Sequence, residues 1–328
     1  MSRTAQITGA LLLVVVFATI AAGWGLYARS TVDSRPKSLG LQLIDALRQR
    51  QLPKANQLLD QGADIAVREQ YTGQTCLMAA AATGDLAIIQ RLIQHGARVD
   101  DTDNYGRTAF DQLFLSGSVK YPVAKALLPK SAVIRRKQPG GPSTLETAVQ
   151  THDSAIVGLV LDSGANPSGT DMGMKPLLIV AAESDDLPTV NLLVNHGAAV
   201  NARGPLHETA LSTAIRLTDE AMAQFLVAHG ADVNALDTDH TPVLVAASAS
   251  NLPITVAALL RKGAKVDARN AAGETALITA ARDGRRAIVE QLLKRGADPT
   301  IKDKTSRTAR DWAKEQGFAD IERLLATH

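Results

Sequence analysis

The sequence predicts an all-α solenoid, a row of similar helix pairs, and three observations support this prediction. A Gly-Ala pair returns after leucine-rich stretches, and the last four spacings between these pairs are 33 residues each. In five units a Thr- or Pro-containing helix start precedes the pair by 21 or 22 residues. Hydrophobic residues make up 45% of the chain but aromatic residues only 3%, so Ala, Leu, Val and Ile must form the core. The pairs begin at Gly62, Gly96, Gly164, Gly197, Gly230, Gly263 and Gly296.

The composition limits the classes of function. The formal net charge is only +2, whereas a general nucleic-acid binder carries a clearly basic domain, so no nucleic-acid partner is expected. The single cysteine, Cys76, excludes an internal disulfide framework and a cysteine-based zinc site. It occupies the proline position of a helix start, where we expect it to be half buried. Residues 39–328 are more than one compact core usually contains, which favours a repeated architecture.

The amino terminus predicts a membrane anchor. Residues 1–6 form a short tail, and the next 21 residues, Ile7 to Tyr27, carry no charged side chain. Because about 20 helical residues cross the hydrocarbon core, residues 7–27 are predicted to be a transmembrane helix, followed by a polar linker over residues 28–38. A cleaved signal peptide that begins with Arg3 is the alternative, but signal-peptide apolar cores are usually shorter.

The flanking charges leave the orientation of the anchor open. More Lys and Arg residues follow the apolar run than precede it, and this bias alone would place the repeat domain in the cytosol. The very short tail before the run is typical of exported proteins instead. We therefore predict a single-pass protein of a bacterial inner membrane with its repeat domain in the periplasm. A cytosolic domain, or a periplasmic domain released by cleavage, is the alternative.

Each unit after residue 38 is predicted to contain two helices. The first helix begins at a threonine such as Thr75 or Thr275, whose hydroxyl caps free backbone N–H groups, or beside a proline such as Pro176. Small residues follow, and they let neighbouring helices approach closely. The second helix carries Leu and Ile at a spacing of three to four residues and ends at the glycine, which adopts a left-handed conformation.

The two end units differ from the others because one of their faces meets water rather than a neighbouring unit. At the front, residues 39–50 and 53–61 are predicted to form two helices without a threonine start. At the back, Thr308 opens the last pair of helices, and we expect Trp312 to take part in packing.

This pattern resembles the ankyrin repeat family, in which a turn and two antiparallel helices form a unit of about 33 residues. The resemblance covers residues 39–328, about nine units. It implies a concave surface of hairpin tips and first helices that binds other proteins. Carried onto this chain, it implies partner-binding roles for the hairpin residues Tyr71, Thr72, Gln74, Asn104, Tyr105 and Arg107 and the helix-edge residues Glu183, Arg282 and Asp283.

Two departures from the repeat add candidate contacts. Ser131-Ala132 replaces the Gly-Ala pair of the third unit, and the loop that follows carries Arg135, Arg136 and Lys137. This loop is either a solvated connection or a basic finger that touches an acidic partner or an anionic surface. Met172 and Met174 lie in a hairpin, where methionine either fills a gap or contacts a partner.

The sequence contains no pattern that indicates catalysis, so we expect neither an enzyme nor a bound cofactor or metal. Three histidines precede the glycines of separate units and favour the carboxyl ends of helices. The carboxylates around Asp185 lie in an open turn, whereas acid–base chemistry needs a pocket that shifts their pKa. The histidines are His95, His196 and His229.

The predicted function is therefore protein binding by a rigid surface. A membrane-tethered or exported solenoid of this kind would bind or inhibit a protein of the cell envelope. Two narrower hypotheses remain as alternatives: an immunity protein that masks a toxin, and a binder of anionic surfaces through residues 135–137.

Overall fold

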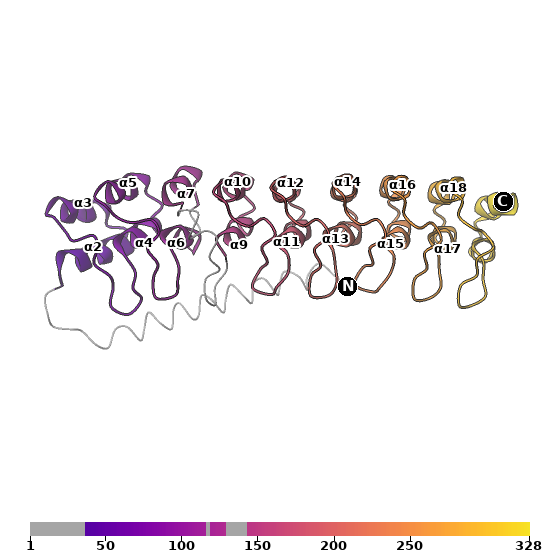
Figure 1. Cartoon of the computed structure of the whole chain (residues 1–328), viewed down its shortest axis with the longest axis horizontal. Coiled ribbons are helices and arrows are strands. Elements are labelled where there is room, and N and C mark those ends of the chain that lie inside the picture. The colour runs from indigo at the N-terminus through magenta and orange to yellow at the C-terminus, as the bar shows by residue number, and fades with distance from the viewer. Residues whose placement is uncertain (1–36, 116–118, 129–142) are drawn as a thin grey trace.

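The computed structural model describes residues 37–115, 119–128 and 143–328. In this part of the chain eighteen helices form nine antiparallel pairs, which lie side by side in one elongated row (Figure 1). The described residues form no extended strand, and only isolated bridges such as Arg68–Thr75 close the bases of the loops between units. The prediction of an all-α solenoid of about nine units is confirmed.

The first helix of every unit lies in an inner row, next to the loops that connect successive units (Figure 1). The inner helices are α2 (Leu39–Arg48), α4 (Cys76–Ala81), α6 (Ala109–Leu115), α9 (Thr144–Val149), α11 (Leu177–Glu183), α13 (Ala210–Arg216), α15 (Val243–Ala249), α17 (Ala276–Arg282) and α19 (Ala309–Glu315).

The second helix of every unit lies in an outer row, on the far side from those loops (Figure 1). The outer helices are α3 (Leu52–Asp60), α5 (Leu86–Gln94), α7 (Tyr121–Leu127), α10 (Ser154–Asp162), α12 (Leu187–Asn195), α14 (Glu220–Ala228), α16 (Pro253–Arg261), α18 (Arg286–Lys294) and α20 (Ala319–Ala326).

Several predicted segments lie outside the described residues. These are the tail at 1–6, the predicted transmembrane helix at 7–27, most of the linker at 28–38 and the basic loop at 135–137. No helix of the described part of the chain has both the length and the apolar composition that crossing a membrane requires.

The predicted threonine caps are present at α4, α13 and α17, whereas α15 starts after Pro242 without a side-chain cap from Thr241. The hydroxyl oxygen of Thr75 accepts a hydrogen bond from the Met78 N–H at 3.3 Å. The Thr275 hydroxyl accepts one from the Ile278 N–H at the same distance. Each bond satisfies a backbone donor that a helix start would otherwise leave free.

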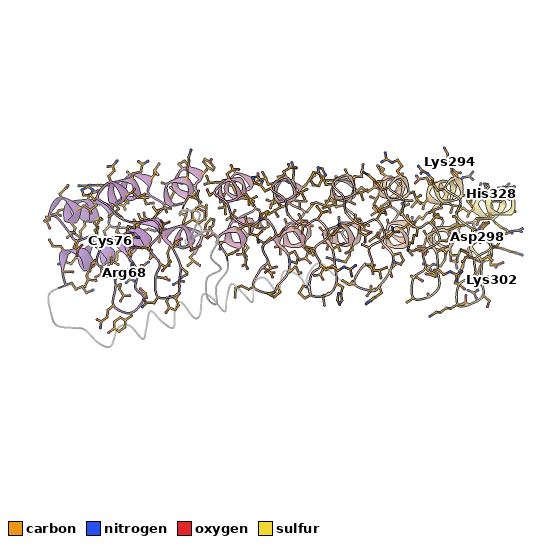
Figure 2. The ribbon with its side chains drawn as sticks, in the orientation of Figure 1. Arg68, Cys76, Lys294, Asp298, Lys302 and His328 are labelled. Atoms are coloured by element: carbon orange, nitrogen blue, oxygen red, sulfur yellow. The ribbon has the colours of Figure 1, made fainter. Side chains whose placement is uncertain are left out.

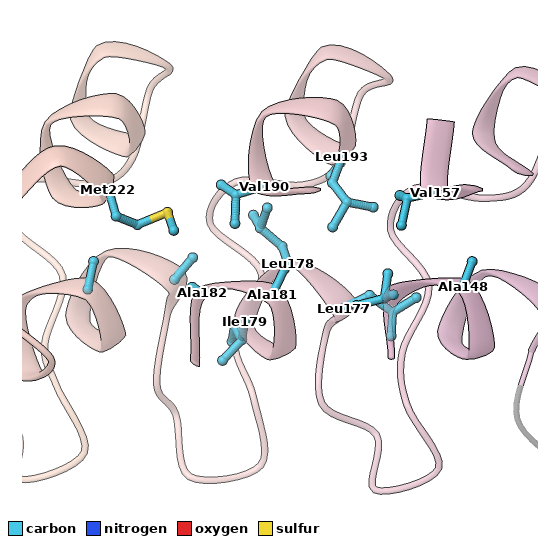
Figure 3. Packing of buried hydrophobic residues seen from close by; sticks show 14 of the residues in the cluster. Ala148, Val157, Leu177, Leu178, Ile179, Ala181, Ala182, Val190, Leu193 and Met222 are labelled. Carbon is cyan, nitrogen blue, oxygen red and sulfur yellow. The ribbon is translucent and has the colours of Figure 1, made fainter. Parts of the chain in front are cut away.

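One continuous core runs between the two rows of helices and is built from small and branched aliphatic side chains. In the fifth unit, Leu178 of α11 lies below Val190 of α12, so the core joins the two helices of a pair (Figure 3). Ala182 faces the sixth unit, from which Met222 points back (Figure 3). Because each unit buries its sides against its neighbours, stability is expected to depend on nearest-neighbour contacts.

The single cysteine is more deeply buried than the sequence suggested. Cys76 is completely buried rather than half buried, and its Sγ lies 3.9 Å from the carbonyl oxygen of Gly40. Burial, and to a smaller extent the charge of Asp64, raises the pKa of the Cys76 thiol to about 12. The thiol is therefore protonated at neutral pH, and Cys76 is a core residue.

Neighbouring units are also joined by hydrogen bonds that repeat along the solenoid. In four successive units a side-chain oxygen accepts a hydrogen bond from a backbone N–H located 31 residues further along the chain. The donor–acceptor distances lie between 2.7 and 3.1 Å. These bonds fix the register of adjacent units. The pairs are Ser168 with Ala199, Asn201 with Asp232, Asn234 with Lys265, and Asp267 with Asp298.

Glu220→Ala is expected to lower the free energy of unfolding by about 1 kcal/mol, a typical value for a lost cap. Helix α16 has no cap of its own, and Glu220 Oε1 of α14 instead accepts hydrogen bonds from Ile254 N (2.9 Å) and Thr255 N (3.2 Å). Urea denaturation measures the change. The control is Glu290→Ala, which removes only an exposed ion pair with Arg286 and should cost under about 0.5 kcal/mol. Equal losses in both variants would contradict the capping role.

Thr218→Gly is expected to raise stability by about 0.5–1 kcal/mol. Thr218 has a φ of +60°, a left-handed conformation that strains a β-branched residue, and Gly84 and Gly284 occupy the same place in other units. The relief of strain outweighs the extra chain entropy of glycine. The matched control is Ser184→Gly, where φ is −89° and stability should fall. A lower melting temperature for Thr218→Gly would contradict this explanation.

Candidate functional site

The loops between units form fingers that project from the inner row of helices, and their side chains extend beyond the ribbon (Figures 1 and 2). In four of the described fingers a side-chain oxygen organises the tip by accepting hydrogen bonds from backbone N–H groups two and four residues further on. Asp237 Oδ1, for example, accepts from Asp239 N at 2.9 Å and from Thr241 N at 2.8 Å. Asp103, Asn270 and Asp303 make the same pair of bonds. Such tips are held rigidly.

The sixth unit has glycine, Gly204, where the two neighbouring fingers have Asp171 and Asp237, and the carboxylate of another residue takes over the role of the aspartate. The buried side chain of Glu208 occupies the space that a side chain at Gly204 would need, and it accepts a hydrogen bond from Leu206 N at 2.8 Å. His207 at this tip adopts a left-handed φ of +63°. The finger keeps its shape although its sequence departs from the repeat.

Large apolar side chains lie exposed on four of the fingers, in units two, three, five and six. Their exposed fractions are 73% for Tyr71, 48% for Tyr105, 63% for Met172, 65% for Met174 and 67% for Leu206. We call these five residues the apolar fingertip row. Monomeric proteins rarely leave a series of large apolar side chains in water without a use for them.

Four of the five residues were predicted from the sequence, and Leu206 was missed. Its finger reads Gly204-Pro205-Leu206-His207, which lacks the glycine-flanked pattern of the other hairpins. Counting forward by one repeat of 33 residues from Gly173, which lies between the two methionines of the preceding hairpin, would have placed Leu206 at a tip. The structure thus extends the predicted surface by one unit.

Other predicted contact residues of these fingers support the fingers themselves. The Thr72 hydroxyl donates a hydrogen bond to Glu69 at 2.5 Å, and Gln74 Oε1 accepts one from Arg48 Nε at 2.8 Å. Asn104 joins two fingers, because its backbone N–H donates to the Thr72 carbonyl at 2.8 Å. Burial alone would raise the pKa of Glu69, but hydrogen bonds from Thr72 and Tyr71 outweigh it and lower the pKa.

Arg107 makes both a structural contact and a contact with the fingertip row. Its guanidinium lies 4.7 Å from the ring centre of Tyr105. It also pairs at 2.9 Å with Asp103, whose side chain is only 1% exposed. Since a buried carboxylate without its cation is costly, Arg107 is needed for the stability of this finger.

The predicted helix-edge residues take part in ion pairs at the carboxyl ends of inner helices, away from the second and third units. Glu183 pairs with Lys175 at 2.8 Å and lies 3.8 Å from Arg216. Arg282 pairs with Asp283 at 3.0 Å and also with Glu274. The predicted helix-edge residues therefore lie apart from the fingertip tyrosines, and Glu183 lies three units from Arg282 and Asp283.

Among the described residues, no three His, Cys, Asp or Glu side chains lie close enough to bind one metal ion. The histidines before the glycines lie against their own helices, with His95 Nδ1 2.7 Å from the Arg91 carbonyl oxygen. His196 makes a similar hydrogen bond with the Leu192 carbonyl oxygen and a second one with the Asp162 carboxylate, and both raise the pKa of His196. A hydrogen bond with Asp219 raises the pKa of Asp185, but the Asp185 side chain lies in open solvent.

Comparison with known proteins identifies the family of the repeats and a relative that matches part of the chain. A family model described as ankyrin repeats (3 copies) matches residues 43–138, 145–237 and 234–303, most of the chain. Ankyrin repeat and SAM domain-containing protein 6 from Danio rerio is 44% identical over 54 residues. That stretch is 16% of this chain and 7% of the relative, so the chain spans only a small part of the relative's length.

Proposed function

Because this chain belongs to the ankyrin repeat family, whose repeats are protein–protein interaction modules, we propose that it binds a partner protein through the apolar fingertip row. The observation that carries this proposal is the exposure of five large apolar side chains on the fingers of units two, three, five and six. Tyrosine, which contributes two of them, is enriched among the residues that dominate binding energy.

Rigidity makes this surface suited to binding. The fingers are held by side-chain hydrogen bonds to their own backbones, and Asn104 links the fingers of units two and three. Little conformational entropy is then lost when a partner docks, so more of the apolar contact energy appears as affinity. Tyr105 is further oriented by the guanidinium of Arg107.

The proposed setting is the envelope of a bacterial cell. Residues 7–27 would anchor the protein in the inner membrane, and the linker at 28–38 would hold the repeat domain close to the periplasmic side. The uncharged run of 21 residues supports this proposal. Alkaline phosphatase fused after His328 is expected to be active, because the enzyme folds only after export. An inactive fusion that is made in full would instead place the domain in the cytosol.

Within that setting we propose that the protein binds, and thereby inhibits or protects, an envelope protein; an immunity role against a toxin is one form of this. The test is capture of the partner from solubilised membranes by the full chain, followed by mass spectrometry. A protein captured by the wild type should be lost with the triple variant Tyr71→Ala, Tyr105→Ala, Leu206→Ala. A variant at the tip of the ninth unit, Lys304→Ala, is the matched control. Equal capture by the triple variant would contradict the proposal.

A further inference from the structure

A groove of about 370 Å³ crosses the inner face of units six to eight, away from the tyrosines of the fingertip row. Helices α13, α15 and α17 form its floor, and the fingers of the same three units form its wall. It extends across three units, so an occupant would be elongated rather than compact.

The groove exists because the seventh unit has small residues where its neighbours have larger ones. Ala249 of α15 lies between Arg216 and Arg282, which occupy the same position 33 residues before and after it. Ala246 likewise lies between Thr213 and Thr279, again at intervals of 33 residues. Two alanines in the middle unit therefore open a space that two long side chains close off at its ends.

The charges around this space are mainly negative. Four carboxylates line the groove against two guanidinium groups. Both guanidinium groups already have acidic partners, since Arg282 pairs with Glu274 and Asp283, and Arg216 lies 3.8 Å from Glu183. Asp237 and Asp239 lie on the finger of the same unit as the two alanines. The four carboxylates belong to Glu208, Asp237, Asp239 and Glu274.

The floor also contains polar groups that the described residues leave unsatisfied. The side-chain hydroxyls of Thr213 and Thr279 are buried, with each residue 2% exposed, and make no hydrogen bond with any described residue. A buried hydroxyl without a partner costs free energy. An occupant that supplies acceptors, such as the carbonyl groups of an extended peptide, would remove that cost.

We propose that this groove binds an extended basic segment of the partner protein, with a lysine or arginine side chain above Ala246 and Ala249 and next to the carboxylates of Asp237 and Asp239. The inference rests on the proposed function, because it assumes that the chain binds a protein. It adds a second contact area, which selects partners by charge while the fingertip row contributes apolar contact.

The test measures binding of a short fluorescent peptide of alternating lysine and alanine to the full-length protein by fluorescence anisotropy. The lysine peptide is expected to bind, and a peptide with glutamate in place of lysine is not. Asp239→Asn should weaken binding about fivefold, and added salt should weaken it further. Asp162→Asn, which removes an exposed carboxylate from the outer helix α10, is the control and should change nothing.

Ala249→Arg gives the sharpest result, because it fills the groove and adds a positive charge. The variant should fold, since arginine occupies the same position in α13 and α17, and circular dichroism checks this. We expect it to lose the lysine peptide completely. Peptide binding that survives Ala249→Arg, or equal binding of the lysine and glutamate peptides, would overturn the inference.

The same variants separate this inference from the proposed function. The double variant Tyr71→Ala, Tyr105→Ala should still bind the lysine peptide, because both residues lie outside the groove. If partner capture requires the tyrosines but neither capture nor peptide binding responds to Ala249→Arg, the groove proposal is wrong and the fingertip proposal stands.

Discussion

Asp303→Ala is expected to destabilise the carboxyl-terminal unit by about 3 kcal/mol, because it removes the shared acceptor of three hydrogen bonds to a charged group. Asp303 is 8% exposed. Its carboxylate accepts hydrogen bonds from the indole Nε1 of Trp312 at 2.7 Å, from Thr305 N at 2.8 Å and from Arg307 N at 3.1 Å. The finger and α19 are therefore held together by one side chain.

Hydrogen exchange measures this effect directly. Amides of α19 and α20 should exchange much faster in Asp303→Ala than in the wild type, while those of α13 and α14 should change little, since repeat units are stabilised by their nearest neighbours. Lys304→Ala, which alters the exposed neighbour in the same finger, should stay within about 0.5 kcal/mol of the wild type. Unchanged exchange in Asp303→Ala would contradict the structural role of this carboxylate.

The same residue makes the unit sensitive to acid. Burial alone would raise the pKa of Asp303, but hydrogen bonds from Thr305, Trp312 and Arg307 outweigh it and lower the pKa from 3.8 to about 2. A carboxyl group whose pKa falls on folding contributes stability above its unfolded pKa and loses that contribution as the pH falls. The wild type should therefore exceed Asp303→Asn in free energy of unfolding by its largest margin above pH 3.8. This margin should shrink as the pH falls towards 2.

Replacing both fingertip tyrosines with alanine is expected to weaken partner binding at least 100-fold, since truncating a central interface tyrosine typically costs about 2 kcal/mol. Tyr71 and Tyr105 are 73% and 48% exposed in the unbound protein, so the melting temperature should change little. Titration calorimetry with the purified partner measures the affinity. A fall in stability as large as the fall in binding energy would show that the tyrosines serve the fold instead.

Arg107→Ala should behave differently from the tyrosine variants. It leaves the side chain of Asp103, which is 1% exposed, without its paired cation. Because the Arg107 side chain is 34% exposed, the cost should fall below the value of about 3 kcal/mol that is typical of a fully buried ion pair. A weaker binding constant for this variant is therefore evidence about the interface only after its loss of stability has been measured.

The sequence was sufficient to predict the fold because the signals are local and repeated. Thr75 caps the start of its own helix, α4. Gly230, with a φ of +91°, follows the end of α14. Each signal occupies a few neighbouring residues and returns with the period of the repeat. The number of units and the positions of the helices follow directly from that period.

Contacts between units could not be predicted in the same way. Glu220 caps a helix that starts about one repeat later, and Asn104 binds the backbone of Tyr71 in the preceding finger. Such bonds depend on the register of adjacent units and on side-chain conformation. For the same reason the sequence could not show that Thr72 and Arg107 support the fingers, or that Glu208 replaces a missing aspartate.

Site-specific photo-crosslinking tests the central claim most directly. A photoreactive phenylalanine analogue replaces Tyr71, Tyr105 or Leu206 in the full chain, and, as controls, the exposed outer-helix residues Gln90 and Asn191. We expect one and the same protein to be crosslinked from all three fingertip positions and from neither control. Crosslinks to that protein from the outer helices alone, or none from any fingertip, would contradict the account.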